Sequence, residues 1–436
     1  MQVEAQAPIS NMSSFVEKLQ ELHDPRDNRG KRHTLAFVLA AVAIAIMSGR
    51  STVSGIQRFI KHKIKWLRKI TGYHGANPVS RAQLPRILAV VNLMELNEVI
   101  MLHLGVRLEQ NTKGEWEIMS EKVVDEASRQ TNSGLGSERN DEAECVASDD
   151  SESIEADRQA SSGKDEDAEW AALDGKTLRG TDQQEERTLL AVTHIQRRIL
   201  AQRPMRGPKE SEIPAGRTLL AETGLERAKI TLDALHLNPT TTAQIHQKGG
   251  YFIIQAKENQ PKLEAQLQQA ATQVEPLGGV STIGKAHGQI EKRQGVFFAV
   301  GGRAFAERWA ESGFQTLIVM ERERFEVAKG KRTAKTSYYL SNVSMEEERD
   351  EVQQELFAAI RGHWGVEADN HIRDVTFNED HIKTKNGYQG QVMSTLRTLA
   401  MGLFRRDNIE NFKAALDEFT DKPKRFKKFL RRAHFL

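Results

Sequence analysis

The fold is decided by a run of short apolar segments in the middle of the chain: EWAALD (169–174), ERTLLAVTHIQ (186–196), RRILAQRPM (197–205), AKITLD (228–233) and YFIIQA (251–256). Segments of this length, rich in branched and aromatic residues, are typical of β-strands. The first three follow one another closely, which favours antiparallel hairpins. Helical periodicity over 214–224 and 240–248 precedes the last two strands. The order β-β-β-α-β-α-β predicts an α/β fold built on a mixed sheet.

The regions on either side of these strands have different patterns. Between residues 280 and 343 the segments GVFFAV, FQTLIVM, RFEVA and SYYLSNV indicate further strands, which we interpret as a β-rich insertion. A helical block is expected from about Ser344. Residues 10–118 show long helical periods without strand alternation and predict an all-α N-terminal domain. The expected helices there cover 12–22, 35–48, 53–70, 81–90 and 95–108.

Charge is distributed unevenly along the chain. The 436 residues include 62 Lys and Arg against 60 Asp and Glu, but the stretch from Glu121 to Glu169 holds 16 acids and 5 bases and hardly any large apolar residue. Such a composition predicts a disordered acidic linker, and it conceals two basic flanking regions. The segment Lys422 to Arg432 has seven bases and no acid. It indicates either a polyanion-binding helix or a solvated helix end.

These shifts predict five parts. They are a helical domain at 1–118, the linker at 119–168, the first part of an α/β core at 169–273, the insertion at 274–343, and a helical remainder of the core with a basic tail at 344–436.

Composition also excludes several classes of protein. The single cysteine, Cys145, excludes an internal disulfide framework and suits a reducing cytoplasm. The longest apolar run, Leu35 to Met47, has 13 residues, whereas a membrane-spanning helix needs roughly 20. The N-terminus lacks the pattern of a secretory signal. We therefore expect a soluble cytoplasmic protein without a membrane partner.

Two aspartates stand at predicted strand ends, Asp174 in ALDGKT and Asp233 in TLDALH. Carboxylates at the C-terminal ends of strands occupy the edge where α/β folds place their chemistry. Either residue alone could equally open an ordinary turn.

A third group of polar residues lies in the segment from Ala358 to Asp380. In a helix, one face of this segment would carry His363, Glu367, Asn370, His371 and Asp374. An adjacent apolar stripe of Phe357, Ile360 and Trp364 is expected to pack on the sheet. The alternative is an exposed face of salt bridges.

Carboxylates from three distant positions suit hard divalent cations. Asp174, Asp233 and Glu367 could hold two Mg²⁺ or Mn²⁺ ions, an arrangement that supports in-line phosphoryl displacement. Zinc bound by His363, Glu367 and His371 is the competing interpretation, because histidines at this spacing also converge on a helix face.

The chain resembles the DDE transposases of bacterial insertion sequences, in the group of the H-repeat-associated proteins. The resemblance covers most of the chain outside the acidic stretch. It is carried by HDPRDNRGKRHTLAFVLAAVAIAIMSG (23–49), ALDGKTLRG (172–180), ITLDALHLNPTTTAQIHQKGGYFIIQAKENQP (230–261), HGQIEKR (287–293) and RGHWGVEADNHIRDVTFNED (361–380).

The resemblance implies an RNase H-like core in which Asp174, Asp233 and Glu367 are the catalytic and metal-binding acids. The chain departs from the family pattern where Ala368 replaces an Asn, and where Asp374 follows Glu367 by seven residues instead of eight. Asp374 is accordingly expected to be a supplementary metal ligand or an acid behind the ligands.

The helical domain at 1–118 is predicted to be DNA-binding and, with the basic C-terminus, to bind the DNA ends, whereas the core that starts at 169–273 is the catalytic one. Several single residues are also predicted to contact DNA. Lys257 aligns with a family lysine and could contact a phosphate, although a solvated lysine fits as well. Arg361 could contact a phosphate, and Trp364 a base beside the cut; burial of Trp364 in the core is the alternative. The loop from Asp24 to His33 adds phosphate contacts or forms only a polar turn; its candidates are Arg26, Arg29 and Lys31.

These features predict a transposase that cleaves insertion-sequence ends with Mg²⁺ or Mn²⁺ and transfers the strand to target DNA, working as a homodimer on paired ends in the bacterial cytoplasm at the nucleoid. A metal-dependent endonuclease without strand transfer is one alternative. An inactive, domesticated DNA-binding protein is another.

Overall fold

The computed structural model describes residues 13–75, 77–110, 116–120, 169–181, 185–208, 211–286, 288–302, 305–345, 349–381, 383–384 and 386–436. Most of the predicted acidic linker, residues 121–168, lies outside this set. Its first two positions, 119 and 120, belong to a strand.

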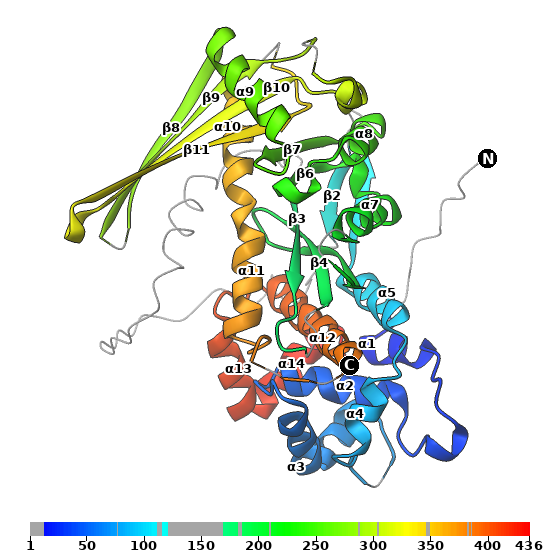
Figure 1. Cartoon of the computed structure of the whole chain (residues 1–436). Coiled ribbons are helices and arrows are strands. Elements are labelled where there is room, and N and C mark those ends of the chain that lie inside the picture. The colour runs from blue at the N-terminus through cyan, green and yellow to red at the C-terminus, as the bar shows by residue number, and fades with distance from the viewer. Residues whose placement is uncertain are drawn as a thin grey trace, which may run out of the picture.

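The centre of the molecule is a nine-stranded mixed sheet with the order β5-β4-β3-β6-β7-β11-β10-β9-β8 (Figure 1). β3 pairs in parallel with β6, and β6 with β7; all other neighbours are antiparallel. The strands are β3 (Ala171–Thr177), β4 (Glu186–Thr193), β5 (Ile199–Arg206), β6 (Lys229–Leu232), β7 (Tyr251–Ala256), β8 (Pro276–Ala286), β9 (Gln289–Ala299), β10 (Thr316–Glu326) and β11 (Lys331–Ser341).

The predicted order of elements is found in the first part of this sheet. Helix α7 (Glu212–Thr223) lies between β5 and β6, and α8 (Pro239–Gln247) lies between β6 and β7. The mixed α/β prediction is therefore confirmed, whereas the closer RNase H-like assignment stays a prediction.

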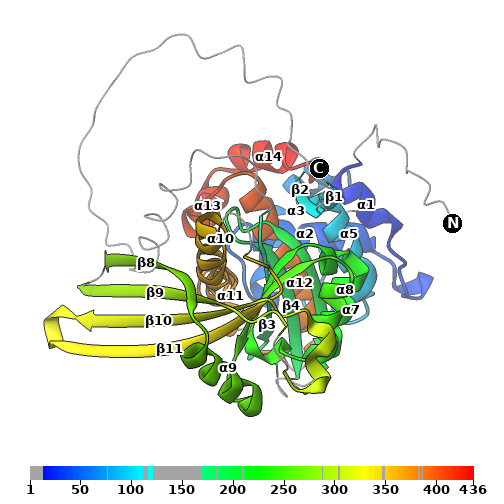
Figure 2. The same cartoon turned by 90° about the horizontal axis from the view of Figure 1, so that it is seen from above.

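The segment expected to be an insertion consists of strands, but these continue the same sheet. Strand β11 pairs antiparallel with β7, with Leu340 opposite Ile254, because β7 would otherwise leave a row of backbone groups unpaired at an edge. The far halves of β8 to β11 extend away from the body as an arm (Figure 2). On β11, residues 331–336 of this arm are all exposed.

Helices cover both faces of the sheet near β3. The face formed by Leu173, Ile230 and their neighbours shares a core with α7, α8 and α9 (Pro261–Gln273). The opposite face packs on α10 (Arg349–Gly362), α11 (Trp364–Val375) and α12 (Gly387–Arg406). Because side chains alternate along a strand, Ala172 and Asp174 point to the α11 side.

The first and last helices of the chain share one hydrophobic core with α12. Every residue of α2 is buried. The backbone N–H of Phe15 donates to the carbonyl of His434 at 2.9 Å, so the two ends of the described chain are in direct contact. The helices are α1 (Phe15–Lys18), α2 (Leu35–Ile46), α3 (Val53–Thr71), α4 (Gln83–Leu88), α5 (Leu93–Leu104), α13 (Phe412–Asp421) and α14 (Pro423–Arg432).

The all-α prediction for residues 1–118 is wrong at its C-terminal end. Helix α5 stops at Gly105, which adopts a left-handed backbone with φ 69° that glycine tolerates best. Strands β1 (Val106–Gln110) and β2 (Trp116–Ser120) then form an antiparallel pair. In β1, Val106 and Leu108 alternate with Arg107 and Glu109, a period that favours a strand over a helix.

In the described part of the chain, no helix combines the length and apolar character needed to cross a membrane.

Candidate active site

Asp174 and Asp233 stand together where two parallel strands separate. The last parallel pair of β3 and β6 joins Leu173 to Leu232, and an aspartate is the next residue of the chain after each. Asp233 directly follows β6 and accepts a hydrogen bond from the backbone N–H of Leu235 at 3.0 Å. Asp174 remains within β3, which continues beside β4. The register thus brings the two predicted carboxylates to one point of the sheet.

Helix α11 brings the third acid to the same side of the sheet. The predicted helix over 358–380 is split into α10 and α11 at His363. One face of α11 approaches β3: the amide nitrogen of Asn370 donates to a carboxylate oxygen of Asp174 at 3.0 Å. Glu367 lies one turn earlier on this helix and is exposed.

Two of the three acids, Asp174 and Glu367, have raised pKa values. Burial raises the pKa of Asp174 to about 7, and the negative charges of Asp233, Glu212 and Glu367 add to this rise. Burial also raises the pKa of Glu367; Lys257 opposes the rise and Asp233 reinforces it. Like charges gathered in a partly buried place are typical of sites that bind a cation or transfer protons.

Glu212, a buried residue in the first turn of α7, is a fourth acid that the sequence did not reveal. Its carboxylate lies where a side chain on Gly175 would be, because a Cβ atom there would come within 2.0 Å of an oxygen of Glu212. Arg187 balances this acid from 3.6 Å, and a ring nitrogen of His236 lies 3.9 Å from it. An acid at the start of a helix is commonplace, so its sequence carries no functional signal.

The chemistry of these residues fits a hard divalent cation, although their side chains are not arranged as a finished binding site. In the described ranges, no three His, Cys, Asp or Glu side chains are placed to hold one ion. The donors are nonetheless carboxylate oxygens that repel one another, and the buried amide oxygen of Asn370 has no hydrogen-bond partner. A cation would satisfy both needs. Glu367 is exposed and has room to rotate toward the aspartates.

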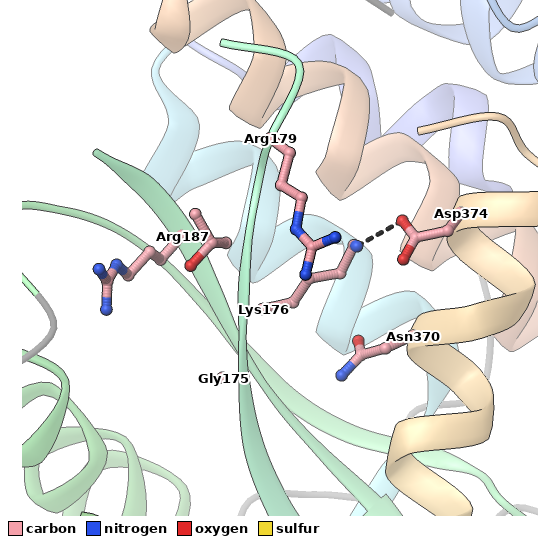
Figure 3. A pocket seen from close by; sticks show the side chains of 7 residues that line it. Gly175, Lys176, Arg179, Arg187, Asn370 and Asp374 are labelled. Carbon is pink, nitrogen blue, oxygen red and sulfur yellow. Dashed lines mark hydrogen bonds and ion pairs between the residues drawn. The ribbon is translucent and has the colours of Figure 1, made fainter. Parts of the chain in front are cut away.

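A cavity of about 500 Å³ opens beside Asp174 between β3 and α11. In Figure 3, Lys176 extends from β3 toward Asp374 and Asn370 on α11. The residues that line the cavity are Gly175, Lys176, Thr177, Arg179, Arg187, Asn370 and Asp374. Three cationic side chains therefore stand next to the carboxylates, and the sequence analysis had not singled them out.

Asp374 is engaged in this cavity by an ion pair. Its carboxylate accepts a hydrogen bond from the ammonium of Lys176, which also lies 3.4 Å from Asp380. This contact accounts for the position of Asp374 without a metal. Its predicted role as a supplementary ligand stays a prediction.

The histidines of the predicted stripe lie apart from each other. His363 is within hydrogen-bond distance, 2.9 Å, of the hydroxyl of Thr231, which lies equally close to His194. Burial lowers the pKa of His363 to about 4, so its ring is neutral at pH 7. His371 is exposed on α11. These positions give the zinc alternative no support.

The apolar stripe packs as expected over only part of its length. Phe357 and Ile360 on α10 are buried, but 55% of Trp364 is exposed. The alternative that Trp364 belongs to the core is wrong, because Trp364 begins α11 on an exposed face, whereas Val366 in the same turn is buried. Lys257 is exposed at the end of β7 and near enough to lower the pKa of Glu367. Arg361 is half-buried in the last turn of α10.

The loop from Asp24 to His33 has one internally bound base and two exposed ones. Arg26 forms a 2.7 Å ion pair with Asp24 and donates to the carbonyl of His33, also at 2.7 Å. Arg29 and Lys31 are exposed. Arg26 thus holds the turn together, whereas the other two could contact a phosphate.

Comparison with known proteins gives one family and several relatives. Residues 16–104, which form α1 to α5, match the DDE_Tnp_1-associated family. The chain is 26% identical over 262 residues to "H repeat-associated putative transposase YhhI" of Escherichia coli (strain K12), covering 58% of this chain and 67% of that protein. It is 26% identical over 261 residues to "Putative protein YbfL" of the same strain, covering 57% and 67%. It is 20% identical over 409 residues to "Putative transposase YncI" of Escherichia coli O157:H7, covering 91% and 88%.

Proposed function

Because the chain is a relative of the DDE transposases of the H-repeat group, we propose that it is a DNA transposase that cleaves the ends of its element and transfers the cut strand to target DNA. The observation that supports this proposal is the position of Asp174 and Asp233 at the same edge of the sheet, where burial and the negative charges of Asp233 and Glu367 raise the pKa of Asp174 to about 7.

The three acids would hold two Mg²⁺ or Mn²⁺ ions. Bound there, the ions would neutralise charge on the attacking and leaving oxygens of a phosphodiester. Asp374 would support the ligands from behind through Lys176.

The side chains around the acids would bind and orient the DNA. The cavity beside Asp174 is lined by Lys176, Arg179 and Arg187, which would bind a backbone phosphate next to the one that is cut. Lys257 would contact the scissile strand near Glu367. Exposed Trp364 would stack on a base flanking the cut, and Arg361 would contact a nearby phosphate. Catalysis would then depend on positioning and charge, without a covalent intermediate on the protein.

The test is cleavage of a duplex that carries the inverted repeats flanking the gene, with purified protein and Mg²⁺. Asp174→Asn and Glu367→Gln, made singly, should each lower the cleavage rate about 10³-fold, which corresponds to about 4 kcal/mol of barrier. DNA binding should be largely kept. Asp417→Asn, an exposed acid on α13, is the matched control. Full cleavage by either site variant would overturn the assignment.

Strand transfer needs its own measurement, because a plain endonuclease would pass the cleavage test. Pre-nicked ends with a free 3′-hydroxyl should be joined to a target plasmid by the wild-type protein. Cleavage without joining would favour the endonuclease. Binding without either reaction would favour an inactive DNA-binding protein.

A further inference from the structure

Helix α3 has a basic outer face that the motifs of the chain did not reveal. Arg58, Lys61, Lys65 and Lys69 follow one another at helical spacing and are all exposed. The buried residues Ile56, Ile60 and Leu67 occupy the opposite face. No acidic residue is present in the helix.

Helix α14 repeats this arrangement at the other end of the chain. Phe426, Phe429 and Leu430 are buried in the common core. Lys424, Lys427, Lys428 and Arg431 lie on the side that faces away from this core, and all but the half-buried Lys427 are exposed. The helix contains no acid.

The two helices are in contact with each other. The rings of Trp66 on α3 and Phe426 on α14 stack with centroids 6.0 Å apart. The views of Figures 1 and 2 show both helices in the helical part of the molecule, away from the strand arm. None of the eight outward bases forms an ion pair with an acid in the described part of the chain. By contrast, Arg425 and Arg432 on α14 do, with Glu418 and Asp407.

Eight unbalanced positive charges on adjoining helices repel one another, and they are best explained by an external polyanion. The stripe on α3 rises by 11 residue steps from Arg58 to Lys69, which is about 16 Å at 1.5 Å per step. Duplex DNA presents roughly nine phosphate charges along such a length. The two faces offer Lys and Arg but no Asn, Gln or Glu at these positions. Lysine-rich faces contact phosphates and carry little base readout.

We propose that the outer faces of α3 and α14 form one surface that binds the phosphate backbone of double-stranded DNA without regard to sequence. The proposal rests on the proposed function in taking DNA as the partner, but it concerns affinity and not chemistry. It assigns this surface to DNA outside the recognised ends, such as flanking or target DNA.

The experiment measures binding of the full chain to a 30-base-pair duplex of unrelated sequence by fluorescence anisotropy, without metal, over a range of salt concentrations. The α3 variant replaces Arg58, Lys61, Lys65 and Lys69 by Gln, and the α14 variant replaces Lys424, Lys427, Lys428 and Arg431 by Gln. Each should weaken binding about tenfold or more and reduce the salt slope by about 3 to 4, since each phosphate contact contributes about 0.9. The combined variant should lose about twice as much slope.

The control variant makes the same change of charge elsewhere, with Gln at the exposed residues Lys248, Lys262, Lys285 and Lys335. Circular dichroism of each variant checks folding, which Gln on a helix surface should preserve. An equal loss in the control would show a general charge effect and overturn the proposal. So would unchanged DNA binding accompanied by lost sedimentation with anionic lipid vesicles, which would assign the surface to a membrane.

Failure of this proposal and failure of the proposed function give different results. If the protein is not a nuclease, the Asp174→Asn and wild-type proteins are equally inactive while the α3 variant still loses affinity for DNA. If the surface does not bind DNA, cleavage of the ends still depends on Asp174 while the α3 variant binds normally.

Discussion

Helix α11 and the turn that follows it contribute to two buried clusters of charge, and the clusters differ in how the charge is balanced. Around Asp174 the nearby charges are mostly carboxylates, and the pKa of that residue rises to about 7. Around Glu379, burial alone would raise the pKa, yet the guanidinium groups of Arg373 and Arg397 hold it below its usual value. These ion pairs measure 3.0 Å and 3.3 Å.

The contrast separates a structural cluster from a functional one. Glu379 has its partners within the chain and needs nothing from outside. Asp174 shares its surroundings with other acids, which is unfavourable for the protein alone and becomes favourable when a cation binds. Total burial does not distinguish them, because both acids are largely removed from water. The sign of the neighbouring charges does.

The largest effect on stability is expected from the cluster around Glu379, in which Arg373 and Arg397 balance the negative charge. Glu379→Gln leaves two buried guanidinium groups without a negative partner and should lower the free energy of unfolding by about 3–5 kcal/mol. Urea denaturation followed by circular dichroism measures this loss. Asp417→Asn, which breaks an exposed pair with Lys413, is the control and should change stability by less than about 1 kcal/mol. Equal losses in both variants would remove the distinction between buried and exposed pairs.

Mutation of Asp174 should instead raise the stability of the protein. The folded-state pKa of Asp174 lies near 7 against an ordinary value of 3.8, so the folded protein holds a proton that the unfolded chain releases between these pH values. Stability therefore falls as the pH rises from about 4 to 7. Asp174→Asn should remove this penalty, gaining about 2–4 kcal/mol at pH 8 and almost nothing at pH 4. A variant that is less stable than wild type at pH 8 contradicts this account.

A divalent cation should stabilise the protein by balancing the negative charges around Asp174. Mg²⁺ at ten times its dissociation constant should stabilise the wild-type protein by about 1.4 kcal/mol at pH 8, and less at pH 5, where Asp174 is protonated. Thermal unfolding with and without EDTA measures the difference. Asp174→Asn serves as the matched control and should show little response. An equal response in both proteins places the ion elsewhere.

The smallest effect is expected at Asp374, between the two clusters. Among the described residues its carboxylate pairs with Lys176 alone, and 31% of its side chain is exposed. Asp374→Asn should cost less than about 1 kcal/mol of stability and slow cleavage less than tenfold. A loss of cleavage as large as that of Glu367→Gln would instead make Asp374 a metal ligand.

Local pattern predicted those features that depend on neighbouring residues in the sequence. The order of strands and helices from β3 to β7 followed from periodicity. The meeting of Asp174 and Asp233 was predicted because each stands just after an apolar strand segment. The helical character of the segment holding Glu367 was likewise evident.

Features that depend on packing between distant segments were not predictable in this way. Glu212 approaches Asp174 only because α7 crosses the sheet over a glycine. Trp364 belongs to an apolar stripe by its spacing, but periodicity does not reveal that the predicted helix is divided at His363 and that Trp364 begins the second helix on an exposed face. The pairing of β11 with β7 joins segments about 80 residues apart, so strands taken for an insertion became part of the central sheet.

The contact between the two ends of the described chain has a consequence for synthesis. The backbone N–H groups of Phe15 and Val16 donate to the carbonyls of His434 and Phe435, so α1 finds these neighbours only after about 400 further residues have been synthesised. A product cut short by a stop codon before α14 would leave Trp66 of α3 without the ring of Phe426 on which it stacks.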